Sequence, residues 1–147
     1  MSEYLDTSVI VKWFRGSEDH HEEAMEILER VRSMETKFVT SSLTILEMTR
    51  ALIKGGETND RIKDASEMLR DCFEIGAIER VSVDNSINRA MILQMDLMLN
   101  SCDAIHVASA IMNGCEVFWS EDYHHTKNKS KDYLKKFDMD VKALKDL

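Results

Sequence analysis

Proline is absent from this 147-residue sequence, and glycine occurs only five times. Average usage of roughly 5% would supply about seven prolines. The lack of proline excludes proline-rich recognition segments and collagen-like repeats, and the few glycines exclude Gly/Ser spacers. Because no linker divides the chain, we expect residues 1–147 to form a single domain.

Cysteines are also few, and long apolar runs are missing. Cys72, Cys102 and Cys115 are odd in number and far apart, which favours neither a Cys-x-x-Cys metal knuckle nor a disulfide framework. The first residues, Met1 to Tyr4, are acidic where a signal peptide is basic, and no apolar run approaches the roughly 18 residues of a membrane span. We therefore expect a cytoplasmic protein with no membrane partner.

Positive charge is in deficit. The sequence holds 19 Lys and Arg against 27 Asp and Glu, a formal net charge of −8. This balance argues against binding nucleic acid by bulk neutralisation of phosphates. The one locally basic stretch, residues 127–147, has seven lysines and four aspartates. A solvated surface helix is the preferred interpretation of that stretch, and contact with RNA is the alternative.

Short apolar runs alternate with longer amphipathic stretches along the chain. This pattern is typical of a parallel sheet covered by helices. The expected strands cover residues 3–6, 37–40, 77–83, 116–119 and 139–144. The hydroxyl pairs Thr7-Ser8 and Ser41-Ser42 are expected to cap helices. The methionines 91, 95 and 98 lie at helical spacing, and we expect them to pack in the core.

Several catalytic signatures are missing from the sequence. His20-His21-Glu22-Glu23 lacks the returning histidine of a zinc protease, and neither Gly-x-Gly-x-x-Gly, a Walker loop nor Gly-x-Ser-x-Gly occurs. Nucleotide-cradle and serine-hydrolase chemistry are therefore disfavoured.

Four acids lie beside apolar sequence, whereas most of the others lie in charged runs. Asp6 and Asp122 follow expected strands, which places them at the carboxyl edge of a parallel sheet, where such proteins bind ligands. Glu47 and Asp103 lie near the starts of apolar helices. Taken singly, each has a plainer interpretation: Asp103 as a helix-start acid, Glu47 as a solvent-facing residue, and Asp6 and Asp122 as turn residues.

Taken together, the four carboxylates predict a cation site. Carboxylates gathered in one cleft repel each other unless they are protonated or neutralised. Mg²⁺ or Mn²⁺ prefers carboxylate and water oxygens and commonly keeps waters that can serve in hydrolysis.

The motifs around these acids resemble a known family. Leu5 to Ser8, the stretch Ser42 to Met48 around Glu47, Asp103-Ala104 with Ala108, and Ser120 to Asp122 occur in the order and spacing of the PIN-domain family. In particular, the sequence is similar to the VapC-like toxin ribonucleases, and the resemblance covers essentially the whole chain.

The resemblance implies a Rossmann-like three-layer α/β/α sandwich with a central parallel sheet of about five strands. It also implies Mg²⁺- or Mn²⁺-dependent hydrolysis of RNA phosphodiester bonds, homodimers, and a small antitoxin that binds across the acidic cleft. By this resemblance Asp6, Glu47, Asp103 and Asp122 would be catalytic metal ligands, directly or through water. The hydroxyls of Thr7, Ser8 and Ser120 would orient carboxylates, waters or a phosphate.

Candidate RNA contacts are basic residues near these motifs: Lys12, Arg15, Arg50 and Lys54. An ion pair between Arg50 and Glu47, three residues apart, is the alternative for Arg50.

The sequence departs from the family after the last acid. Asp122 is followed by Tyr123, His124 and His125, where family members often continue Asp-x-x-Phe. We expect the two histidines to be exposed in a loop, with contact to phosphate or metal as the alternative. His106 is expected to be a packed or surface histidine without a chemical role.

Three functions remain open at this point. The favoured one is a metal-dependent endoribonuclease that acts as the toxin of a type II toxin–antitoxin pair. The second is a housekeeping RNA-processing nuclease, and the third is a catalytically idle metal- or protein-binding module.

Overall fold

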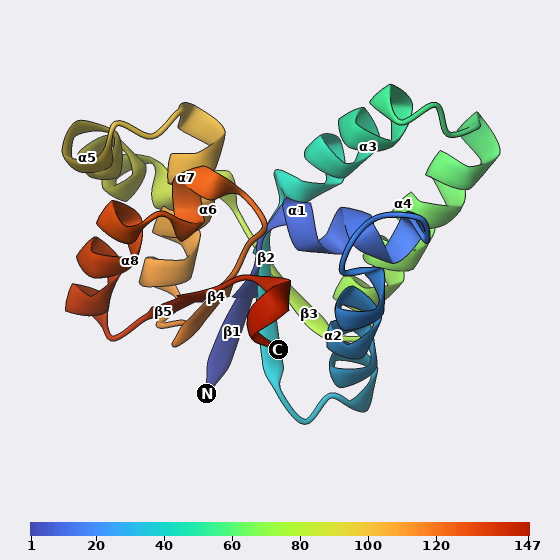
Figure 1. Ribbon diagram of the computed structural model, residues 1–147, viewed down its shortest axis with the longest axis horizontal. Helices are drawn as coiled ribbons and strands as arrows, with labels where there is room; N and C mark the ends of the chain where they lie inside the picture. The colour runs from blue at the N-terminus through green and yellow to red at the C-terminus, as the bar shows by residue number, and fades with distance from the viewer.

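A five-stranded parallel sheet forms the centre of the computed structural model, which describes residues 1–147 (Figure 1). The strand order is β3-β2-β1-β4-β5, and every neighbouring pair is parallel. The strands are β1 Ser2–Leu5, β2 Lys37–Ser41, β3 Ile78–Val81, β4 Val117–Trp119 and β5 Asp140–Lys142. Each strand lies within two residues of its predicted range, so the sequence-based prediction of the sheet is confirmed.

Successive side chains along the strands pack into two separate hydrophobic cores, one on each face of the sheet. Tyr4 and Phe118 lie in one buried cluster, while their chain neighbours Leu5 and Trp119 lie in the other. Successive residues of a strand point to opposite faces, so both faces of the sheet must be covered. This requirement produces the three-layer α/β/α arrangement that the resemblance implied.

Helices of the first half of the chain and helices of the second half lie on opposite sides of the sheet (Figure 1). The first group is α1 Thr7–Ile10, the 3₁₀ helix η1 Val11–Phe14, α2 His21–Ser33, α3 Thr44–Lys54 and α4 Asn59–Glu74. The second group is η2 Val83–Ser86, α5 Ile87–Leu97, α6 Ser101–Met112, α7 Tyr123–Thr126, α8 Asn128–Leu134 and η3 Lys135–Phe137, and η4 Leu144–Asp146 ends the chain. None of these helices is both long and apolar enough to span a membrane.

The helix caps differ from the expected hydroxyl pairs. Asp6 is the cap of α1, and its carboxylate accepts the backbone amide of Ser8. The Ser41 hydroxyl accepts the amide of Leu43, one residue before α3 begins, so α3 itself has no side-chain cap. Asp6 caps α1 in place of the Thr7 and Ser8 hydroxyls because its carboxylate accepts a charge-assisted hydrogen bond at the helix N-terminus.

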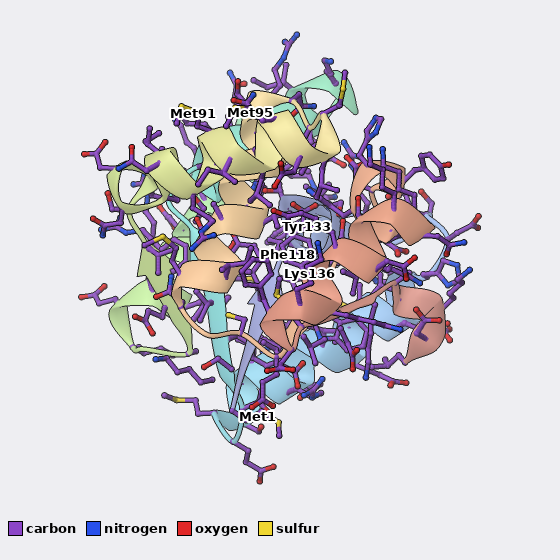
Figure 2. All side chains as sticks on the ribbon, turned by 90° about the vertical axis from the view of Figure 1, so that its left-hand side faces the viewer. Met1, Met91, Met95, Phe118, Tyr133 and Lys136 are labelled. Atoms are coloured by element: carbon purple, nitrogen blue, oxygen red, sulfur yellow. The ribbon has the colours of Figure 1, made fainter.

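The methionine stripe of α5 is exposed, and its assignment to the core was wrong. Met91, Met95 and Met98 are 54%, 66% and 83% exposed, and Figure 2 shows the first two on the outer side of the helix. The core side of α5 consists of Ala90, Leu93 and Leu97. Both sets have helical spacing, so periodicity alone could not decide which one faces the sheet.

Candidate active site

The structure brings all four predicted acids together in one pocket at the carboxyl edge of the sheet. Asp6 follows β1, Glu47 lies in the first turn of α3, Asp103 in the first turn of α6, and Asp122 caps α7. The pocket has a volume of about 360 Å³. Its remaining walls come from Thr7, Ser8, Val11, Lys12, Arg15, Glu18, Ala51 and Glu121.

Asp6 is the most buried of the four acids and is held by hydroxyls. Its Oδ2 accepts the Ser8 amide at 3.1 Å and the Ser8 hydroxyl at 2.6 Å, and the Ser120 hydroxyl lies 3.5 Å away. Burial raises the pKa of Asp6, but the charges of His106 and His125 and the two Ser8 hydrogen bonds outweigh it. The net result is a pKa below the ordinary value, which keeps this carboxylate ionised.

Glu47 is fixed by a hydroxyl from a different element. Thr7 Oγ1 donates to Glu47 Oε1 at 2.8 Å, and the same hydroxyl lies 3.2 Å from Thr44 Oγ1. The Glu47 side chain is 28% exposed. The ion pair with Arg50, which was the alternative to an RNA contact, does not form, and Arg50 is exposed.

Asp103 and Asp122 meet on the far side of the pocket. The amide of Asp103 donates to the Asn100 side chain at 2.9 Å, so Asn100, not Asp103, caps α6. Burial raises the pKa of Asp103, and the charges of Asp122 and Asp6 raise it further, while the charge of His125 lowers it. The pKa of Asp103 therefore lies above its ordinary value, chiefly because of burial, and the two neighbouring carboxylates add to the effect.

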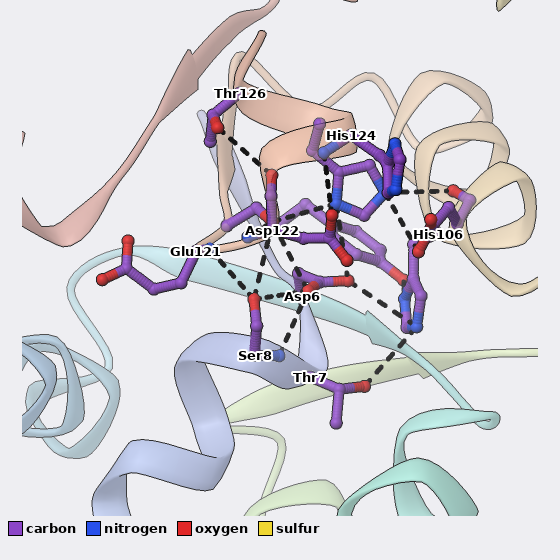
Figure 3. A network of polar contacts seen from close by, with 12 residues as sticks. Asp6, Thr7, Ser8, His106, Glu121, Asp122, His124 and Thr126 are labelled. Carbon is purple, nitrogen blue, oxygen red and sulfur yellow. Dashed lines mark hydrogen bonds and ion pairs between the residues drawn. The ribbon is translucent and has the colours of Figure 1, made fainter. Parts of the chain in front are cut away.

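Ser120 and Ser8 hold the loop that carries Asp122. Ser120 Oγ accepts the Asp122 amide at 3.0 Å, and Ser8 Oγ accepts the Glu121 amide at 2.9 Å. Figure 3 shows Ser8 connecting Asp6 with this loop. The hydroxyls of Thr7, Ser8 and Ser120 thus contact the carboxylates of the site or the loop that carries Asp122. The resemblance implied that they would orient carboxylates, waters or a phosphate, and that role stays a prediction.

His125 is buried, which corrects the expectation that both loop histidines are exposed. Its Nδ1 lies 2.9 Å from Ser120 Oγ, and its Nε2 lies 3.3 Å from the Asp103 carbonyl oxygen. The ring also packs edge-on against Phe118. The physical reason is the short helix α7, which turns His125 inward and leaves His124 exposed.

Asp103, Asp122 and the buried His125 together form a group of three side chains able to bind a metal ion. One ligand atom from each of these residues lies within 4.8 Å of the others. A cation at this place would be held mainly by carboxylate oxygens, and that donor set suits Mg²⁺ or Mn²⁺.

His106 is a site residue that the sequence analysis did not assign. The ring is buried and contacts Glu47 Oε1 through Nε2. Its Nε2 lies 3.7 Å from Asp6 Oδ1 (Figure 3). Burial lowers the pKa of His106, but Asp6 and Glu47 more than compensate and raise it above the ordinary value. The sequence signal was its position three residues after Asp103, which places both on one side of α6.

The four candidate RNA contacts divide into two pairs. Lys12 and Arg15 line the pocket, and both pair with Glu18, at 3.3 Å and 2.9 Å. Arg15 also donates to the Ala51 carbonyl oxygen. Arg50 and Lys54 are exposed and do not line the pocket. Only the first pair is therefore positioned beside the carboxylates.

Comparison with solved structures shows the same fold in two toxin–antitoxin systems. One match is a chain of VapBC2 from Rickettsia felis bound to a DNA fragment from the promoter, with 13% identity and a TM-score of 0.60 over 97% of this chain and 98% of that one. A second is a chain of a toxin–antitoxin complex from Klebsiella pneumoniae, with 18% identity and a TM-score of 0.61 over 86% of this chain and 92% of that one.

The family of this chain is shown by a match to a family model. No curated protein matches the chain. The model of the PIN domain, however, matches residues 4–130, which contain all four acids of the pocket. The chain belongs to the PIN-domain family.

Proposed function

We propose that this protein is a Mg²⁺- or Mn²⁺-dependent endoribonuclease that acts as the toxin of a type II toxin–antitoxin pair. The observation that carries the proposal is the convergence of Asp6, Glu47, Asp103 and Asp122 in one pocket, although they are up to 116 residues apart in the chain. Membership of the PIN-domain family and the fold shared with proteins of toxin–antitoxin complexes support it.

The proposed reaction is hydrolysis of an RNA phosphodiester bond by in-line attack of water on phosphorus. Asp6, Glu47, Asp103 and Asp122 would hold the cation directly or through water. When bound, such an ion lowers the pKa of water and neutralises charge that develops on the phosphate. The role of Ser8 is to fix Asp6, and that of Thr7 is to fix Glu47, so that neither carboxylate has to be ordered when the ion binds.

Lys12 and Arg15 are the cations best placed to contact the RNA backbone. Both lie at the pocket wall and share Glu18 as their anionic partner. A phosphate that enters the pocket would compete with Glu18 for these two side chains. Because the chain has a net charge of −8, we expect weak binding that depends on the divalent cation and on these local charges.

The proposed partners are an antitoxin and a second copy of the chain. A pocket lined by six carboxylates suits a basic side chain from a small inhibitor, which would exclude both the cation and the substrate. The toxin–antitoxin complexes that share this fold support such a partner.

Cleavage assays test the proposal. The wild-type protein is incubated with structured and unstructured RNA, and with DNA of the same sequence, in Mg²⁺, Mn²⁺ or chelator. Asp6→Asn should abolish cleavage, and Asp71→Asn, an exposed aspartate of α4 outside the pocket, is the matched control. Cleavage that persists in chelator or in Asp6→Asn would refute the metal–carboxylate mechanism. Failure to cut any nucleic acid would favour the idle binding module instead.

A further inference from the structure

Glu47 receives two hydrogen bonds on the same oxygen. Thr7 Oγ1 donates to Oε1 at 2.8 Å, and His106 Nε2 contacts that same atom. Oε2 has no hydrogen-bond partner in the protein. One oxygen of the carboxylate is therefore anchored, and the other is left to bind a cation or a water in the pocket that Glu47 lines.

The buried ring of His106 is held at both nitrogens. Its Nδ1 lies 2.7 Å from the hydroxyl of Tyr4, and its Nε2 faces Glu47. A carboxylate only accepts hydrogen bonds, so Nε2 carries the hydrogen that points at Glu47. In the neutral ring Nδ1 must then accept from Tyr4. Tyr4 is fully buried, and its pKa lies well above the ordinary value because of burial and the charge of Asp6, so it keeps its hydrogen.

Three elements distant in sequence meet in this chain of contacts. Tyr4 comes from β1, His106 from α6 and Glu47 from α3, and Tyr4 and His106 are 102 residues apart. Tyr4 and His106 also pack edge-on, with ring centroids 5.8 Å apart. The ring therefore cannot turn away from Glu47 without breaking its hydrogen bond to the buried Tyr4 hydroxyl, which is costly.

We propose that His106 is a positioning residue that, with Tyr4 behind it, fixes the Glu47 carboxylate for cation binding. The inference rests on the proposed function, because it assumes that Glu47 binds the metal. Glutamate has a long side chain whose ordering costs rotamer entropy. An anchor that is already formed removes this cost from the binding step, as the outer-sphere partners of metal ligands commonly do.

Binding of Mn²⁺ alone, measured by calorimetry and by electron paramagnetic resonance without RNA, tests the positioning role. His106→Leu removes the donor while keeping an apolar side chain of similar size. We expect it to weaken Mn²⁺ binding by about 10–100-fold, the usual effect of losing an outer-sphere partner. Tyr4→Phe should weaken binding less, because the ring stays in place. His106→Gln, whose amide can reach Glu47, should recover part of the affinity.

Val107→Ala is the matched control for damage to the fold. Val107 is buried on the same helix, but it packs in the core on the sheet face and is not part of the pocket. Its truncation should lower Tm and leave the Mn²⁺ affinity unchanged. If His106→Leu binds Mn²⁺ as tightly as the wild type or more tightly, the positioning role is wrong.

A second measurement separates this inference from the proposed function. Long-range ¹H–¹⁵N NMR of the metal-free wild type should place a ring hydrogen of His106 on Nε2. A ring that carries its only hydrogen on Nδ1 would overturn the inference whatever the protein binds. A wild type that binds no Mn²⁺ while Nε2 carries the hydrogen would instead overturn the metal-dependent function, and the role of His106 in cation binding would fall with it.

Discussion

Asp6 and Ser8 close a small ring at the start of α1, in which one carboxylate oxygen accepts both the amide and the hydroxyl of the same serine. The two distances are 3.1 Å and 2.6 Å. The amide bond fixes the helix cap, and the hydroxyl bond links the cap to the loop after β4 through the amide of Glu121. One serine therefore couples the fold of α1 to the placement of two pocket walls.

Ser8→Ala should destabilise the protein and reduce cleavage together. The substitution keeps the amide bond to Asp6 but removes the hydroxyl bond, and hydrogen bonds to charged groups contribute about 1.5–3 kcal/mol. Urea unfolding measures the loss. Ser33→Ala, which removes an exposed hydroxyl bond at the end of α2, is the control and should cost less than about 0.5 kcal/mol. Equal losses for the two variants would contradict a special role for Ser8.

The stability of the metal-free protein should depend on pH through His106. Burial lowers the pKa of His106, but Asp6 and Glu47 raise it above the ordinary value of about 6.5. A raised histidine pKa adds to the free energy of unfolding. This contribution is fully present below about pH 6.5, the pKa of the unfolded state, and is lost as pH rises through the pKa of the folded state. The free energy of unfolding of the wild type, relative to His106→Gln, should therefore fall as pH rises above 6.5.

Asp6 acts in the opposite sense and in a separate pH range. Its lowered pKa gives stability that is present above the ordinary value of about 3.9 and is lost as pH falls through the folded value. Urea titrations from pH 3 to 9 in chelator measure both effects. A difference between wild type and His106→Gln that stays flat or grows above pH 6.5 would contradict the raised pKa of His106.

Asp103→Asn should abolish cleavage and stabilise the metal-free protein at neutral pH. The pKa of Asp103 is raised by burial and then by the charges of Asp122 and Asp6, so its ionised form is unfavourable in the folded state. Neutralising it removes that repulsion, and each kcal/mol gained raises Tm by about 2–4 °C in a chain of this size. Thermal unfolding in chelator measures the change. A large fall in Tm would show that the carboxylate has a structural role instead.

The sequence predicted the sheet and the four acids, because both depend on local pattern. The five strands are short apolar runs in the sequence. Asp6 directly follows the first of them, and Asp122 lies three residues after the end of the fourth. The two buried histidines depend on distant contacts instead. The orientation of the His106 ring depends on its hydrogen bond with Tyr4, which is 102 residues away. His125 is turned inward by a four-residue helix within a polar segment. The short-range periodicity of the sequence therefore could not predict that either histidine is buried at the site.

Glu18→Gln should strengthen binding of RNA. Glu18 is the shared anionic partner of Lys12 and Arg15 at the pocket wall, with contacts of 3.3 Å and 2.9 Å. Removing its charge frees both cations for phosphates and lowers the repulsion of the backbone, so affinity should rise and the salt dependence should steepen. Fluorescence anisotropy of a labelled RNA in the Asp103→Asn background, over a series of salt concentrations, measures both quantities without cleavage.

The matched control for Glu18→Gln is Glu29→Gln, which breaks an equivalent pair with Arg32 on α2, away from the pocket. Both variants change the net charge by one unit, so a bulk electrostatic effect would strengthen RNA binding equally in the two. A larger gain for Glu18→Gln, removed by adding Lys12→Gln, would assign the effect to the pocket wall. Equal gains, or none, would place the RNA contacts elsewhere, and the exposed Arg50 and Lys54 would then be the next cations to replace.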